Sequence, residues 1–279
     1  MPIHDQGYRR YGGTRAAVGH TWQVMVRAGV KSVISKRVFI GVMLWAWAPF
    51  VVRAVQIYVA ANFTQAAFLA PKGETFREFL DQQGLFVFFV TLYVGAGLIA
   101  NDRRANALQL YLSKPMTRAE YIAGKLAILF LFLVAVTFLP AMALLLTQAI
   151  FAGSFTFVRN NLYLLPAITL YSLMQVLVAA TSVLALSSMS KSARFVAVMY
   201  AGLFFFTTAL FQAIRGITGK NSFVWLSPGA SLEQLGDVIF RLPPRYQVSP
   251  AVAGLTVLVL IAGSLYILNR RVRGVEIVT

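Results

Sequence analysis

Six runs of apolar residues divide the chain, and segments rich in polar and charged residues separate them. The runs cover residues 38–61, 84–100, 126–151, 162–186, 195–214 and 252–268. A helix needs about 20 mostly apolar residues to cross about 30 Å of bilayer hydrocarbon. Each run is close to that length, and the two shortest, the second and the sixth, are expected to extend a few residues beyond these limits. The pattern predicts an all-α membrane protein with six transmembrane helices.

The six runs contain few polar groups. Arg53 is the only Lys, Arg, Asp or Glu within them. Its long side chain either reaches the headgroups near the end of the first span or faces a translocation path, and both interpretations stay open. Uncharged polar residues such as Gln175 are expected to form hydrogen bonds between helices, although each could also line a path. Pro140 and Pro166 each remove a backbone hydrogen bond, which predicts kinks in the third and fourth spans.

Two longer connections follow the first and the fifth span. The connection at 62–83 contains three acidic residues and is expected to hold a short helix at 75–82. The connection at 215–249 contains a Pro-Gly turn, after which a short helix is expected from Ser231. Four apolar residues of this connection either enter the membrane interface or pack on the protein surface: Trp225, Leu232, Leu235 and Ile239.

The segment 20–37 has the pattern of an amphipathic helix. Apolar residues, among them Trp22, recur at helical spacing, while Arg27 and Lys31 fall on the opposite side. Because this segment directly precedes a span, it is predicted to be an N-terminal interfacial amphipathic helix, with Arg27, Lys31 and Arg37 meeting anionic headgroups of the lipid bilayer. An ordinary soluble amphipathic helix is the alternative. The first 37 residues lack the apolar core of a cleavable signal peptide, so the N-terminus is expected to be retained.

A charged segment lies between the second and third spans, at residues 97–125. Its sequence is GLIANDRRANALQLYLSKPMTRAEYIAGK. Residues 105–112 contain no Gly or Pro, and apolar side chains recur there at helical spacing, which predicts a short helix. Pro115 is expected to end this helix. Thr117 and Glu120 have the spacing of a capping box, which predicts that a second helix starts there and continues into the third span.

This segment resembles the first cytoplasmic loop of ABC-2 type permeases, the membrane subunits of a class of ATP-binding cassette transporters. The resemblance rests on an acidic residue followed by basic residues, then ALQLYLSKP, TRAEY and GK. Asn106 and Ala107 stand where many members have Gly-Thr, and Asp102 stands where Glu is common. The positions that match the pattern are Asp102, Arg103, Arg104, Leu108, Tyr111, Leu112, Lys114, Pro115, Arg118 and Lys125.

The resemblance implies that the short helix is a coupling helix seated in a cleft of a separate ATPase subunit. It also implies that the N-terminal amphipathic helix touches that ATPase, which makes Arg27, Lys31, Lys36 and Arg37 further interface candidates. The alternative is that 97–125 is an ordinary solvated loop between two membrane helices.

The distribution of charge predicts the orientation. The formal net charge is +16, and 17 of the 25 Lys and Arg lie in the N-terminal segment, the 97–125 loop, the connection between the fourth and fifth spans, and the C-terminal tail. Seven lie in the remaining connections. By the positive-inside rule both termini are cytoplasmic. The charge therefore indicates topology, and a nucleic-acid partner is not expected.

The chain lacks the residues that nucleotide, metal or acid–base chemistry would need. It has no GxxxxGK[ST] phosphate loop, so ATP and Mg are expected in the partner ATPase and no cofactor is expected in this chain. There is no cysteine, and the two histidines, His4 and His20, both lie in the N-terminal tail. No catalytic or metal-binding residue is therefore expected, and the chain is not expected to be an enzyme.

Taken together, the residues and the resemblance predict three regions. These are a cytoplasmic tail with the interfacial helix at 1–37, a six-span ABC-2 type transmembrane domain at 38–268, and a cytoplasmic C-terminal tail at 269–279. The expected protein is a permease subunit of an exporter in the plasma (inner) membrane of a prokaryote, as a homodimer or paired with a similar permease. One alternative is a membrane scaffold or sensor that docks a partner and transports nothing. An ATP-independent carrier is disfavoured because the predicted spans contain no Asp or Glu.

Overall fold

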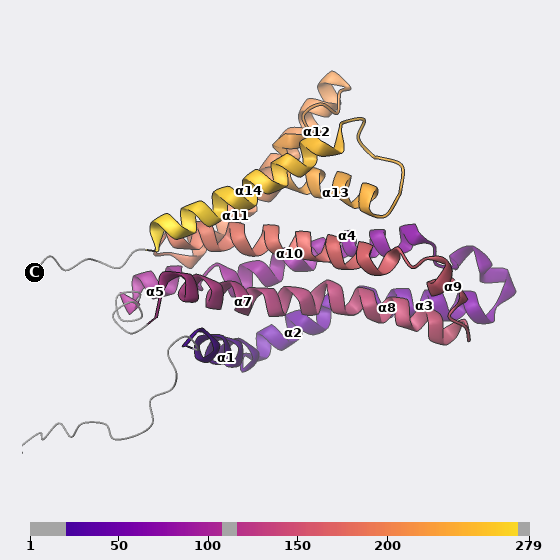
Figure 1. The fold of residues 1–279 in the computed structure, drawn as a ribbon, viewed down its shortest axis with the longest axis horizontal. Helices are drawn as coiled ribbons and strands as arrows, with labels where there is room; N and C mark the ends of the chain where they lie inside the picture. The colour runs from indigo at the N-terminus through magenta and orange to yellow at the C-terminus, as the bar shows by residue number, and fades with distance from the viewer. Residues whose placement is uncertain (1–20, 108–115, 273–279) are drawn as a thin grey trace, which may run out of the picture.

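The computed structural model describes residues 21–107 and 116–272. In this part of the chain six helical segments are long and apolar enough to cross a membrane, which confirms the predicted number of spans. They lie side by side along the long axis of the molecule (Figure 1). The segments are Arg37–Asn62, Gly73–Arg104, Arg118–Phe151, Leu164–Met189, Ala193–Thr218 and Pro250–Arg271.

The spans are built from shorter helical elements, and the described residues contain no strand. The elements, in chain order, are α1 (Thr21–Ile34), α2 (Arg37–Ala46), α3 (Ala48–Asn62), η1 (Thr64–Leu69), α4 (Gly73–Val90), η2 (Thr91–Gly95), α5 (Ala100–Arg104), α7 (Arg118–Val136), α8 (Phe138–Phe151), α9 (Thr156–Asn160), α10 (Leu164–Met189), α11 (Ala193–Ala201), η3 (Gly202–Phe206), α12 (Thr207–Thr218), η4 (Val224–Leu226), α13 (Pro228–Ile239) and α14 (Pro250–Arg271). The η2 and η3 elements are single π-helical turns within the second and fifth spans.

Helix α10 is the centre of the bundle and contacts α4, α7, α8, α13 and α14. Its inner surface carries small residues such as Ala179 and Ala180, which allow neighbouring helices to approach closely. The predicted kink at Pro166 is wrong, because α10 is one continuous helix that begins at Leu164. Pro166 lies in its first turn, where a backbone N–H has no partner within the helix, so the proline removes nothing.

The predicted kink at Pro140 is confirmed. Helix α7 ends at Val136 and α8 begins at Phe138, so the break falls just before the proline that cannot donate to the Val136 carbonyl. A second break separates α2 from α3 at Trp47. The Trp47 Nε1–H donates to the Ala135 carbonyl oxygen at 3.1 Å, so the two breaks lie next to each other.

The second span is longer than its apolar run. Helix α4 starts at Gly73 rather than at residue 84 and includes the short helix expected at 75–82. Consequently Glu78 and Asp81 lie on the same helix as the apolar run, and the expectation that the spans contain no Asp or Glu is wrong for this helix. Arg53 forms an ion pair with Glu78, with 3.2 Å between Nη2 and Oε2, an arrangement that neither sequence interpretation of Arg53 included.

The two ends of the bundle differ. At one end, here called the loop end, lie α1, α5, the start of α7 and the end of α14 (Figure 1). Away from the loop end, α12 and α14 diverge from α10, and α13 lies in the wedge between α10 and these two helices (Figure 1). This side of the molecule, which also includes α9 and the end of α3, is here called the far end. The helix expected from Ser231 is present as α13, but it starts at Pro228, so Pro228 and Gly229 belong to its first turn instead of preceding it. Its N-cap Ser227 accepts a hydrogen bond from the Ala230 N–H.

Candidate functional site

At the loop end, an ionic network joins the helices on either side of the 97–125 segment. Asp102 of α5 forms an ion pair with Lys125 of α7, with 2.7 Å between Oδ2 and Nζ. The Tyr121 hydroxyl donates to the same carboxylate oxygen, also at 2.7 Å. Tyr121 is fully buried and Lys125 nearly so. Two residues that the resemblance singled out, Asp102 and Lys125, are therefore in direct contact.

The α5 side of this network is attached to the central helix α10. The Ser187 Oγ accepts hydrogen bonds from the backbone N–H groups of Ile99 at 3.2 Å and Ala100 at 2.9 Å, and donates to the Ala96 carbonyl. The Arg103 guanidinium donates to the Ser188 carbonyl oxygen. Ser187 was not identified from the sequence, because a serine in an apolar run carries no pattern that reveals its partner.

The other predicted coupling residues divide into two groups. Arg104, the last residue of α5, and Arg118, the first residue of α7, are both exposed. Of the helix predicted at 105–112, the structure describes residues 105–107. Helix α5 ends at Arg104, Asn106 adopts a left-handed backbone conformation with φ of 53°, and the next helical residue is Ala107, so the start lies at 107 rather than 105. The capping box is confirmed, since the Thr117 N–H donates to Glu120 Oε2 and the Glu120 N–H donates to Thr117 Oγ1. Outside the described residues lie Leu108, Tyr111, Leu112, Lys114 and Pro115.

Helix α1 packs directly against α7. A side chain at Gly29 would place its Cβ 2.3 Å from Ile128 Cδ1, and one at Gly124 would place its Cβ 3.0 Å from Met25 Sδ. Trp22 is half-buried at this contact. The basic side chains predicted to face outward, Arg27, Lys31, Lys36 and Arg37, are all exposed. Figure 1 shows α1 nearly end-on, so it runs across the long axis of the bundle. Its place in a headgroup layer stays a prediction.

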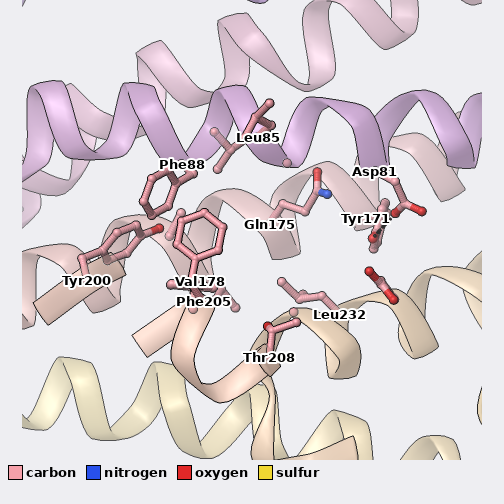
Figure 2. Close-up of a pocket in the computed structure, with 16 residues that line it drawn as sticks. Asp81, Leu85, Phe88, Tyr171, Gln175, Val178, Tyr200, Phe205, Thr208 and Leu232 are labelled. Atoms are coloured by element: carbon pink, nitrogen blue, oxygen red, sulfur yellow. Dashed lines mark hydrogen bonds between the residues drawn. The ribbon is translucent and has the colours of Figure 1, made fainter. Parts of the chain in front are cut away.

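The far half of the bundle contains a cavity of about 330 Å³ between α4, α10, η3 and α13. Figure 2 shows Asp81, Tyr171 and Gln175 toward one end of it, and Phe88, Tyr200 and Phe205 toward the other. Glu233 of α13 also lines the cavity. The cavity thus has a polar end and an aromatic end.

A buried ionic cluster forms the wall behind the polar end. Arg77 is fully buried, and its Nε lies 2.8 Å from Asp237 Oδ1 while its Nη1 pairs with Asp81, one helical turn along α4. Its Nη2 also donates to the Glu233 carbonyl oxygen at 2.8 Å. Arg245 adds a second cation, with its Nη2 3.0 Å from Asp81 Oδ2. These contacts tie α13 to α4, because a buried charge is stable only when it is paired.

The loop after α13 completes the cluster. The Gln234 amide donates to the carbonyl oxygens of Tyr246 and Val248, both at 3.0 Å, and its Oε1 accepts from the Tyr246 N–H. The Tyr246 hydroxyl donates to Glu233 Oε2 at 2.9 Å. Burial, and then the negative charge of Glu233, raise the pKa of Tyr246 to about 12. The hydroxyl therefore keeps its proton at neutral pH and remains a donor.

The sequence did not identify this cluster. Its members were assigned to two separate connections, and Asp237 and Arg245 lie more than 150 residues after Arg77 in the chain. The available signal was Arg77 and Asp81 at i and i+4, a spacing that allows an ion pair on one helix. The four apolar residues of the 215–249 connection have different environments, since Leu232 is buried in the cavity wall and Trp225 is half exposed.

The sequence was compared with known proteins and protein families. No curated protein matches the chain. The family described as ABC-2 family transporter protein matches residues 26–270, which include residues 26–34 of α1, the six spans except the last residue of the sixth, the 97–125 segment and the ionic cluster. This match covers most of the chain and agrees with the resemblance found at 97–125. The chain belongs to the ABC-2 family of transporter proteins.

Proposed function

We propose that this chain is the permease subunit of an ATP-binding cassette exporter and that a separate ATPase subunit docks on the 97–125 segment. The single observation that carries the proposal is the family match over residues 26–270. The sequence contains no phosphate loop, which is consistent with ATP binding by a separate ATPase subunit.

The network at the loop end suggests how the ATPase would move the spans. A docked ATPase would displace the 97–125 segment, and the Asp102–Lys125 ion pair would carry that displacement to α7. The hydrogen bonds of Ser187 would carry it to α10. These contacts are largely buried, so we expect them to persist while the segment moves.

We further propose that the permease works as a homodimer or with a similar permease in the plasma (inner) membrane of a prokaryote. The first and fifth spans are mostly exposed apolar helices, with 11% and 17% of their most apolar windows buried, against 72% for α10. Such surfaces require lipid or a second permease to cover them. Export is the proposed direction because most members of the family are exporters.

The proposal is tested first by purifying the tagged chain from its native membrane in mild detergent and identifying co-purifying proteins by mass spectrometry. We expect a stoichiometric partner that contains a phosphate loop. Leu108→Asp with Tyr111→Ala should then abolish stimulation of that ATPase while the permease still inserts. A matched control is Asn160→Asp with Phe155→Ala at the far end, which adds the same charge and removes one exposed aromatic ring.

Each outcome separates the candidate functions. Normal ATPase stimulation by the Leu108/Tyr111 variant would show that the coupling helix is placed wrongly. A stable partner whose ATPase responds to no solute would favour the scaffold or sensor. Solute flux into vesicles that contain the permease and no ATPase would favour an ATP-independent carrier, for which the carboxylate Asp81 on the second span is a candidate coupling group.

A further inference from the structure

The polar end of the cavity offers hydrogen-bond acceptors. Apart from tyrosines, its ionisable lining residues are the carboxylates of Asp81 and Glu233, and no Lys, Arg or His lines it among the described residues. The Gln175 Nε2–H donates to the Leu80 carbonyl oxygen at 3.1 Å, which leaves Gln175 Oε1 buried without a hydrogen-bond partner in the structure. A buried acceptor of this kind is costly unless a donor from a ligand satisfies it.

Glu233 is the carboxylate of the cluster with the weakest ion pairing. Three carboxylates, Asp81, Glu233 and Asp237, face two guanidinium groups, Arg77 and Arg245. Arg245 lies 3.0 Å from Asp81 but 3.9 Å from Glu233, whose side chain is 39% exposed. A third guanidinium, that of Arg215, stacks on the Tyr246 ring at 5.4 Å and does not line the cavity. The wall of the cavity therefore presents an incompletely neutralised negative charge.

The opposite end presents aromatic surface. Phe88 packs edge-on against Phe205, with 4.8 Å between ring centroids, and stacks on Tyr200 at 5.6 Å (Figure 2). Phe204 completes this part of the lining. Aromatic faces attract cations and provide apolar contact area.

We propose that this cavity binds an amphiphile with a cationic head group, placed at Glu233 and Gln175, and an apolar or aromatic body, placed among Phe88, Tyr200 and Phe205. This inference names the substrate class of the proposed permease and rests on that function. A cation in a low-dielectric site needs an opposite charge close by, and Glu233 supplies it. An anion of the same shape would meet only acceptors and carboxylates at the polar end.

The test compares two ions of the same shape and opposite charge. Radiolabelled tetraphenylphosphonium and tetraphenylborate are equilibrated with the full chain in phosphatidylcholine nanodiscs, and empty nanodiscs give the background. We expect saturable binding of the phosphonium cation only. Glu233→Gln should weaken it about tenfold or more, because the substitution removes the negative charge that attracts the cation. The matched control Glu78→Gln, whose partner Arg53 lies outside this cavity, should bind normally.

Phe88→Ala removes one aromatic face without changing the charge and should also weaken binding of the cation. If the Glu233→Gln variant does not purify as a monodisperse protein, the binding measured for Phe88→Ala decides by itself whether the cation occupies this cavity. Equal binding of both ions, or unchanged binding in both variants, would overturn the proposal. These measurements need no ATPase, so their failure is distinct from failure of coupling at residues 97–125. Saturable binding that leaves the ATPase turnover of the purified complex unchanged would overturn the assignment of the ligand as substrate.

Discussion

At the scale of single residues, Arg77 shows how a charge is retained inside an otherwise apolar bundle. Its side chain is 0% exposed and contacts two carboxylates and a backbone carbonyl. Replacing one partner of such a buried pair leaves the other charge uncompensated, which costs about 3 to 5 kcal/mol. Arg53 contrasts with it, since Glu78 is 47% exposed and pairs of this kind contribute about 0 to 1 kcal/mol.

We therefore expect Arg77→Met to destabilise the protein by roughly 3 kcal/mol, because Asp237 would lose its closest cation. Arg53→Met, the matched control, should change stability by less than about 1 kcal/mol. Thermal unfolding in nanodiscs, followed by tryptophan fluorescence, measures both. Arg77→Met combined with Asp237→Asn should recover part of the loss, since the carboxylate that Arg77 neutralises at 2.8 Å is removed with it. Equal melting temperatures for the Arg77 and Arg53 variants would show that the cluster does not hold α13 to α4.

At the scale of elements, the contact between α1 and α7 is set by two glycines. Gly29 faces Ile128 and Gly124 faces Met25, so the helices approach more closely than larger residues would allow. Because α7 also carries Lys125 and the capping box, α1 and the 97–125 segment are attached to the same helix. A displacement of either one should therefore be felt by the other.

The chain contains no cysteine, which makes this contact directly testable. We expect the double variant Met25→Cys, Gly124→Cys to form a disulfide under mild oxidation, because the Gly124 Cβ position lies 3.8 Å from Met25 Cγ. Loss of both thiols is measured by a mass-shifting maleimide. The control Val24→Cys, Gly124→Cys should stay reduced, since Val24 is 70% exposed on another face of α1. Equal oxidation of both pairs would contradict the packing of α1 on α7.

At the scale of the whole molecule, the fold brings segments rich in Lys and Arg to one end. Arg103, Arg104, Arg118 and Lys125 lie at the loop end together with the last turn of α14, which ends in Arg270 and Arg271 (Figure 1). By the positive-inside rule this end is predicted to face the cytoplasm.

Single cysteines test that orientation. With a membrane-impermeant thiol reagent added to intact cells, we expect labelling of Lys72→Cys and Lys220→Cys at the far end. Arg104→Cys should be labelled only after the cells are opened. All three positions are exposed, so burial does not limit their reaction. Labelling of Arg104→Cys in intact cells would reverse the proposed topology and place the 97–125 segment beyond the reach of a cytoplasmic ATPase.

Whether a prediction from the sequence was correct depended on how far apart in the chain the interacting residues lie. Local patterns succeeded: the six spans, the break at Pro140 and the capping box of Thr117 and Glu120 each depend on neighbours within a few residues. The second span was predicted too short because its charged residues lower the local hydropathy, while several partners that neutralise them, Arg53, Asp237 and Arg245, lie in other segments of the chain. Pro166 was misjudged because its effect depends on where α10 begins.

The sequence by itself determined the class of protein, the number of spans and the family resemblance at 97–125, because membrane insertion depends on the transfer free energy of consecutive residues. The tertiary structure decided which polar groups meet. Asp102 of α5 reaches Lys125 of α7, and Arg77 reaches α13 across 156 positions. The cavity lies between α4, α10, η3 and α13. Packing between these segments, which are distant in the chain, brings its hydrogen-bond acceptors together. Hydropathy reports the cost of burying each residue, whereas pairing in space determines which of these costs are compensated.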